Sequence, residues 1–168
     1  AVRSSVQIRE VLETTVEKIG TTIGVSRCLL LRSLGGPDQL EVFEFVHECI
    51  PPVKNLFCSS DGFAFTQTAL GRISPHDLQD PELDNQSTYD AGFLRRLGIR
   101  SGLIVPLVMR ERVLGVLFLQ DCTEQRQWSI DDVSLIGSLA DHLSVAIENA
   151  ELHQERERQA VTDGLTGI

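Results

Sequence analysis

Apolar and polar positions follow two different periods along this chain, and the change between them marks its elements. From Ser5 to about Ile23 apolar residues recur every three or four positions, which predicts an amphipathic helix that ends at Gly24. The segments VSRCLLLRSL (25–34) and QLEVFEFVHE (39–48) are instead rich in β-forming residues, and GGPD between them favours a turn. We therefore expect a helix followed by an antiparallel pair of strands, the first of them buried on both faces.

The middle of the chain, residues 49–100, is less regular and contains most of the prolines. Here we predict loops with short helices at about 63–70 and 91–97. Two apolar runs follow, SGLIVPLVM (101–109) and VLGVLFLQD (113–121), and the short RER connection between them predicts a second antiparallel hairpin.

From Ser129 onward the pattern predicts a helix of roughly 30 residues, which ends near Val161. Ser129 is a suitable N-cap, and Asp131 and Asp132 complement the helix dipole in the first turn. Two apolar stripes run along this helix and require two partners: one is the domain's own sheet or first helix, and the other is a second copy of the chain. The stripe with heptad spacing is our predicted dimer and signalling seam; it consists of Val133, Ile136, Ala140, Leu143, Ile147 and Ala150. The second stripe consists of Leu135, Leu139, His142, Ala146 and Asn149.

Composition narrows the classes of function. A chain of 168 residues with 42% hydrophobic residues is sufficient for one well-packed domain. Its formal net charge of -9 disfavours nucleic acid and anionic membrane surfaces as partners. No apolar run reaches bilayer-spanning length, and the first ten residues do not resemble a signal peptide, so we expect a cytoplasmic location.

Neither the cysteines nor the histidines form a catalytic or metal-binding pattern. The four cysteines contain no C-x-x-C pair, and Cys28, inside RCLLL, is expected to be a small core residue. The four histidines are scattered over different predicted elements. We therefore expect no metal site and no enzyme activity.

The second half of the sequence resembles a GAF domain. The similarity rests on the S-x-L-x-V-P-L strand (101–107), the G-V-L of the next strand (115–117), the R-x-W segment (126–128) and the helix ending A-I-x-N-A-x-L (146–152). It extends over about residues 5–153. The resemblance implies an α+β fold with a central antiparallel β-sheet, the N-terminal and long C-terminal helices on one face, and loops and short helices over the other. Within GAF domains, EQRQW and the last helix are most similar to those of phytochromes and cyanobacteriochromes.

In such relatives a cysteine followed by histidine attaches a bilin, and this pair falls on Tyr89 and Asp90 here. The second cysteine of some cyanobacteriochromes falls on Phe63. Cys58 is the one remaining candidate for thiol attachment. Attachment there would require a thiol that is both exposed and lowered in pKa, so we expect no covalently bound cofactor. The N-K-x-F-x-D-E pattern of GAF domains that bind cyclic nucleotides is also missing from the sequence.

If a ligand pocket exists, we expect it between the sheet and the middle segment. Its predicted lining is Phe63, Phe65, Tyr89, Phe93 and Leu94 as apolar walls, with Arg95 as a source of charge. The alternative is that these side chains fill the space themselves. The sequence favours neither alternative, an open pocket that binds a small molecule or a pocket filled by side chains.

The last residues, DGLTGI (163–168), resemble the first motif of GGDEF domains, in which D-x-L-T-G-L is usual. We therefore divide the chain into a GAF domain (1–153), a helical linker or coiled-coil stalk (154–162) and the first residues of a GGDEF domain (163–168).

These observations lead to one preferred hypothesis. The chain is expected to be the sensory or regulatory GAF input domain of a bacterial signalling protein, such as a cyanobacterial one. It would form a homodimer through its last helix and control a downstream GGDEF domain of the cyclic di-GMP type. The alternatives are a bilin photoreceptor, a methionine sulfoxide reductase using Cys49 and Cys58, and a structural dimerisation module without a ligand.

Overall fold

A computed structural model describes residues 2–34, 39–79 and 89–166 of the chain, and these form one sheet with helices on both sides. The GGPD turn predicted at 35–38 lies outside the described residues, as do residues 80–88 of the polar segment. The elements in chain order are helix α1 (Val2–Ile23), strands β1 (Arg27–Ser33) and β2 (Leu40–Val46), 3₁₀ helix η1 (Lys54–Cys58), helix α2 (Ser60–Leu70), strand β3 (His76–Leu78), helix α3 (Ala91–Leu97), strands β4 (Ser101–Met109) and β5 (Arg112–Asp121), and helix α4 (Ile130–Thr166).

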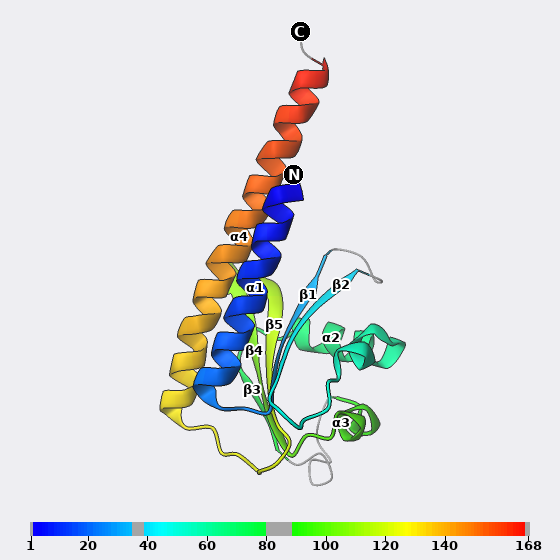
Figure 1. Cartoon of the computed structure of the whole chain (residues 1–168), viewed down its shortest axis with the longest axis vertical. Coiled ribbons are helices and arrows are strands. Elements are labelled where there is room, and N and C mark those ends of the chain that lie inside the picture. Colours follow the sequence, from blue (N-terminus) through cyan, green and yellow to red (C-terminus); the bar gives the residue numbers. More distant parts are fainter. Residues whose placement is uncertain (1, 35–38, 80–88, 167–168) are drawn as a thin grey trace.

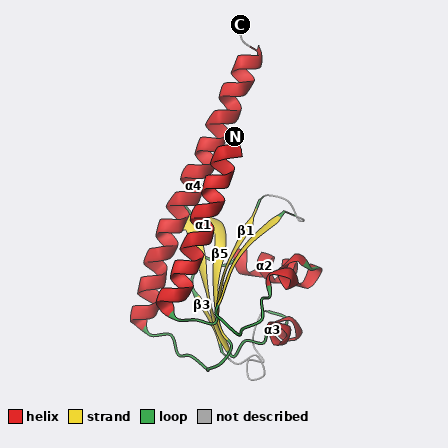
Figure 2. Ribbon diagram, in the orientation of Figure 1, coloured by secondary structure: helices red, strands yellow, loops and turns green. Residues whose placement is uncertain are grey.

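The sheet has the strand order β2-β1-β5-β4-β3, with every neighbouring pair antiparallel. Helices α1 and α4 lie side by side against one face, and α2 and α3 lie over the other (Figure 1). Figure 2 shows the same three layers by type of secondary structure. The predicted α+β architecture is therefore confirmed. Strand β3 and helix η1 were not predicted, since neither short segment has a clear period.

Two apolar cores lie on the two faces of the sheet. Strand β1 contributes to both, because Cys28 and Leu30 face α1 and α4 whereas Leu29 and Leu31 face α2 and α3. All four side chains are fully buried. This confirms that the first strand is buried on both faces and that Cys28 is a core residue. Burial raises the pKa of the Cys28 thiol to about 12, so this thiol stays protonated.

The hairpin between β4 and β5 turns through Arg110 and Glu111, with φ angles of 51° and 64°. Two consecutive residues in the left-handed region are typical of a type I′ turn, which matches the twist of the paired strands. Asn and Gly are the usual residues there. The predicted hairpin is confirmed, although its turn uses residues that adopt this conformation at a cost.

Helix α4 begins as predicted. The Ser129 hydroxyl accepts a hydrogen bond from the Asp132 N–H at 3.0 Å, and the Asp132 carboxylate accepts one from the Ser129 N–H at 3.2 Å. These reciprocal bonds form a capping box. The helix continues to Thr166. The expected break after Val161 is therefore wrong for the described residues.

The heptad stripe of α4 packs inside its own domain. Ile136, Ala140, Leu143 and Ile147 are at most 2% exposed and belong to the core that α1 and α4 form with the sheet. Val133 and Ala150 are half-buried at its margin. These six residues were assigned to the dimer seam, and this assignment requires correction because their stripe already has an intramolecular partner.

Candidate functional site

Five aromatic rings meet between the sheet and the helices α2 and α3, where the ligand pocket was expected. Phe65 of α2 stacks on Phe118 of β5 with ring centroids 5.2 Å apart and an interplanar angle of 14°. Phe57 of η1 meets Phe65 and Phe93 edge to face at 5.8 and 5.4 Å. Tyr89 lies 4.6 Å from Phe65. Such spacings are those of rings in direct contact, so the rings themselves occupy the middle of this layer.

The structure brings most of the predicted pocket residues together. Phe65, Tyr89, Phe93 and Leu94 are at most 5% exposed and belong to one apolar cluster. Phe63 lies on another side of α2 and is half-buried. The Arg95 side chain is exposed, and its Nε donates to the Ala91 carbonyl oxygen at 3.3 Å. The inclusion of Arg95 in the pocket is therefore wrong, because its side chain lies on the solvent side of α3.

Sequence reasoning missed two rings of this cluster. Phe118 follows from the alternation of β5, which places it on the same face of the sheet as Val116. Phe57 had no such signal, because the 3₁₀ helix that directs it inward is only five residues long. In that helix the neighbouring Cys58 is exposed, with Sγ 3.8 Å from the Lys54 carbonyl oxygen. Phe57, rather than Cys58, therefore faces the ring cluster.

Tyr89 and Asp90, where the sequence comparison placed the bilin-binding pair, contribute to packing and to helix capping. Tyr89 is buried beside Phe65, and burial raises the pKa of its phenol, an effect partly offset by Arg72. Asp90 is the N-cap of α3 and accepts a hydrogen bond from the Phe93 N–H at 3.1 Å. A surface cavity of about 190 Å³ lies between α2 and these two residues, which lead into α3. It is lined by Asp61, Ala64, Phe65, Thr68, Tyr89 and Asp90.

A buried arginine anchors α3 to the sheet. Arg27 of β1 is 2% exposed; its Nη1 donates to the Gln120 side chain at 2.6 Å and its Nη2 to the Leu97 carbonyl oxygen at 2.8 Å. Burial lowers the pKa of Arg27, partly offset by Cys122 and Glu44. The acceptor Leu97 is the last residue of α3, and Gly98 then ends the helix in the left-handed conformation at φ 68°. The guanidinium thus satisfies a carbonyl at the end of α3 that the helix cannot satisfy.

Replacing Arg27 by methionine is expected to lower the free energy of unfolding by about 1–3 kcal/mol, because two buried acceptors lose their donor. Urea unfolding followed by circular dichroism measures this loss. Arg95→Met removes the same charge from an exposed position of α3 and is expected to cost less than about 0.5 kcal/mol. Equal stability of R27M and the wild type would show that burying the charge cancels the hydrogen bonds.

On the other face, ionic contacts hold α4 where it leaves the sheet. Glu151 accepts from Arg112 of β5 at 2.6 Å and from Arg32 of β1 at 3.3 Å. Arg32 is only 8% exposed and also pairs with Glu41 of β2 at 3.3 Å. Because these arginines come from two strands, the network joins the sheet to the last turn of α4 that packs on the domain.

The R-x-W segment holds the other end of this helix pair. Arg126 donates to the Ile23 carbonyl oxygen at 3.0 Å, at the C-terminal end of α1. Its guanidinium lies 4.8 Å from the centre of the Trp128 ring, just before α4 begins. A cation over an indole face is favourable, so Arg126 ties the end of α1 to the segment that leads into α4.

Among the described residues, no group of three or more His, Cys, Asp and Glu side chains has an arrangement that could hold a metal ion. In the same part of the chain, no helix combines the length and apolar character required to cross a bilayer.

The sheet order, the paired terminal helices and the short helices over the other face define a GAF-type domain. The family model described as GAF domain matches residues 7–147, and the chain belongs to this family. The structure is similar to the blue-light absorbing form of the PixJ GAF domain of Thermosynechococcus elongatus, with a TM-score of 0.72, 18% identity and 95% of each chain covered. It is also similar to the photoproduct state of GAF3 from Slr1393 of Synechocystis, with a TM-score of 0.69, 22% identity and coverage of 88% of this chain and 98% of the other. At these identities the similarity concerns the fold.

Curated relatives include the circadian input-output histidine kinase CikA of Thermosynechococcus vestitus, 28% identical over 96% of this chain. CikA of Synechocystis is 30% identical over 61% of the chain. The chain spans 23% and 14% of the lengths of these two proteins. It is thus a GAF domain similar to one part of cyanobacterial signalling proteins.

Proposed function

We propose that this domain is a sensory or regulatory input module that passes a change in packing through α4 to an output domain. The observation that carries the proposal is the double role of α4, whose Ile136, Leu143 and Ile147 belong to the domain core while the same helix continues to Thr166. A change in the sheet would therefore reach the far end of the helix without an intervening loop. Energies of a few kcal/mol are sufficient to bias such a two-state element.

The output domain that we propose is of GGDEF type, because residues 163–167 match the D-x-L-T-G motif with which such domains begin. Catalysis would belong to that domain, and the GAF domain itself would have no enzyme activity. The CikA relatives are named as histidine kinases, which supports a signalling role for this domain.

The proposed signal does not require a covalent bilin. Tyr89 and Asp90 occupy the positions of the Cys-His pair, and the rings of Phe57, Phe65 and Phe118 fill the layer in which a pigment would lie. We therefore favour a module that responds to a small ligand at its surface or to a neighbouring domain.

We further propose that the domain dimerises through the exposed stripe of α4. Leu135, Val145 and Leu152 are 46%, 48% and 45% exposed, and Val145 and Leu152 are one heptad apart. Asn149 lies between these two and is exposed. A polar residue at such a position fixes the register of paired helices.

Sedimentation velocity at micromolar concentration tests this arrangement. We expect the wild-type chain to sediment as a dimer, and the double variant Val145→Glu/Leu152→Glu as a monomer, because each copy would bring two carboxylates into an apolar seam. Ile73→Glu makes the same kind of change at a loop residue that is 73% exposed and is expected to leave the dimer intact. A monomeric wild type, or a double variant that remains dimeric, would overturn the proposed seam.

A further inference from the structure

Strand β2 forms one edge of the sheet, since β1 is its neighbour on one side only. The N–H of His47 donates to the Ser26 carbonyl at 2.9 Å, and the N–H of Leu34 donates to the Gln39 carbonyl at 2.8 Å. Because backbone groups alternate along a strand, odd-numbered residues of β2 bond to β1. The N–H and C=O groups of Val42, Glu44 and Val46 therefore point away from the sheet, and among the described residues they have no backbone partner.

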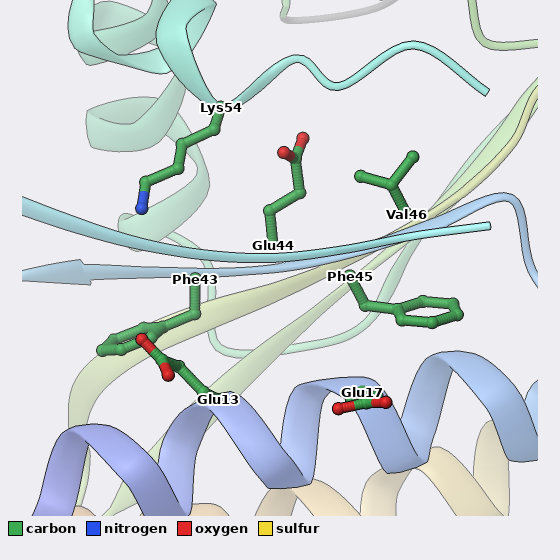
Figure 3. Close-up of a pocket in the computed structure, with 7 residues that line it drawn as sticks. All are labelled: Glu13, Glu17, Phe43, Glu44, Phe45, Val46 and Lys54. Atoms are coloured by element: carbon green, nitrogen blue, oxygen red, sulfur yellow. The ribbon is translucent and has the colours of Figure 1, made fainter. Parts of the chain in front are cut away.

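This edge borders a groove rather than a flat surface. A cavity of about 350 Å³ lies between α1 and β2, lined by Glu13, Glu17, Phe43, Glu44, Phe45, Val46 and Lys54 (Figure 3). Phe43 and Phe45 point from β2 toward α1, while Glu44 and Val46 point to the opposite side, where Lys54 lies. The buried Phe43 and the half-buried Phe45 therefore bound the space on the α1 side, and the outer edge of β2 runs along it.

The charges along the groove differ on the two sides of the strand. Glu13 and Glu17 are exposed one turn apart on α1, and within the described residues neither has an ion-pair partner. Glu44, on the other side, accepts a hydrogen bond from the Val53 N–H at 2.7 Å. Lys54 on that side is exposed. The α1 side thus attracts cations, whereas on the other side the charge of Lys54 offsets that of Glu44.

A second copy of the chain does not suit this edge. Pairing two β2 edges would bring Glu13 and Glu17 of one copy close to the same residues of the other. The formal net charge of each chain is already -9. Like charges across an interface cost affinity and discriminate against such a partner.

We propose that the β2 edge binds an extended peptide segment of a partner protein, which adds to the sheet as a further strand. Side chains of a strand alternate between its faces. The segment would therefore carry Lys or Arg at every second position, facing Glu13 and Glu17, and small uncharged residues such as Thr and Val between them, facing Lys54. Backbone hydrogen bonds to Val42, Glu44 and Val46 would supply affinity, and the alternating charges would set specificity.

The test uses a fluorescent peptide in which Lys alternates with Thr or Val, and the whole chain as its receptor. Binding is measured by anisotropy for the wild type and for Glu13→Lys/Glu17→Lys, which is expected to bind about tenfold or more weakly since two attractions become repulsions. Glu124→Lys/Glu155→Lys changes the net charge equally at two exposed positions and is expected to bind as the wild type does.

Amide hydrogen exchange distinguishes strand addition from attraction of charges alone. We expect the bound peptide to slow exchange at the N–H groups of Val42, Glu44 and Val46 and to leave that of exposed amides elsewhere unchanged. Equal affinity of the wild type and E13K/E17K, or binding without protection of these three amides, would overturn the proposal. Neither result bears on the role of α4, which is a separate proposal.

Discussion

Replacing Leu143 by alanine is expected to lower the free energy of unfolding by about 2–5 kcal/mol, the usual cost of emptying a leucine site in a packed core. Leu143 is 1% exposed and lies among the side chains that join α1, α4 and the sheet. Leu135 lies on the same helix and is 46% exposed, so Leu135→Ala is expected to cost less than about 1 kcal/mol. Urea unfolding of both variants measures the difference.

The comparison decides which stripe of α4 serves the domain and which is available to a partner. Unfolding at two protein concentrations separates the effects, because the stability of a dimer depends on concentration whereas that of a core within one chain does not. We expect the loss in L143A to be the same at both concentrations. A loss confined to the higher concentration would mean that Leu143 stabilises contacts between copies, as its heptad spacing first suggested.

The heptad stripe of α4 was wrongly assigned to a dimer because the sequence alone does not show which surface it packs against. A helix packed on a sheet and a helix packed on its copy both require apolar residues every three or four positions. Ile136 and Leu143 satisfy either pattern equally. The choice depends on which surface lies opposite, and this is fixed only when the sheet forms.

The fold itself was largely predictable because its long elements have clear periods. The helix at α1, both antiparallel strand pairs and the N-cap Ser129 were expected from local patterns and are present. Strand β3 is three residues long, too short for a period, and it forms because β4 offers an edge to His76 and Leu78. The short η1 likewise depends on tertiary contacts.

The candidate site was predicted in part. Apolar residues of the middle segment such as Phe65 and Phe93 gather as expected. Each lies on the inner side of a short helix, and burial of its apolar surface stabilises the fold. Composition could not reveal whether they line a space or fill it, since that depends on Phe57 and Phe118 from elements far apart in the chain. The buried Arg27 was also missed, since its acceptors Gln120 and Leu97 are distant in sequence.

Phe65→Ala should have the largest effect of any single change in the ring cluster, a loss of about 3–5 kcal/mol in the free energy of unfolding. The Phe65 ring has its centroid within 5.8 Å of those of Phe57, Tyr89, Phe93 and Phe118, so its removal deprives four rings of a neighbour. Phe63→Ala makes the same change in the same helix at a half-buried position. Its expected cost is about 1 kcal/mol, and the shared substitution cancels differences in helix propensity.

The same variant tests whether the layer between the sheet and α2 can hold a ligand. An apolar cavity left by a missing ring binds small aromatic molecules, and a ligand that binds only the folded state raises its stability. We therefore expect indole to raise the midpoint of thermal unfolding of F65A and to leave the wild type and F63A unchanged. Stabilisation of the wild type by indole would show that the rings already leave room for a ligand. The proposed ligand would then bind among the rings rather than at the surface. If F65A is instead as stable as F63A, the rings do not form the packed cluster that their spacing indicates.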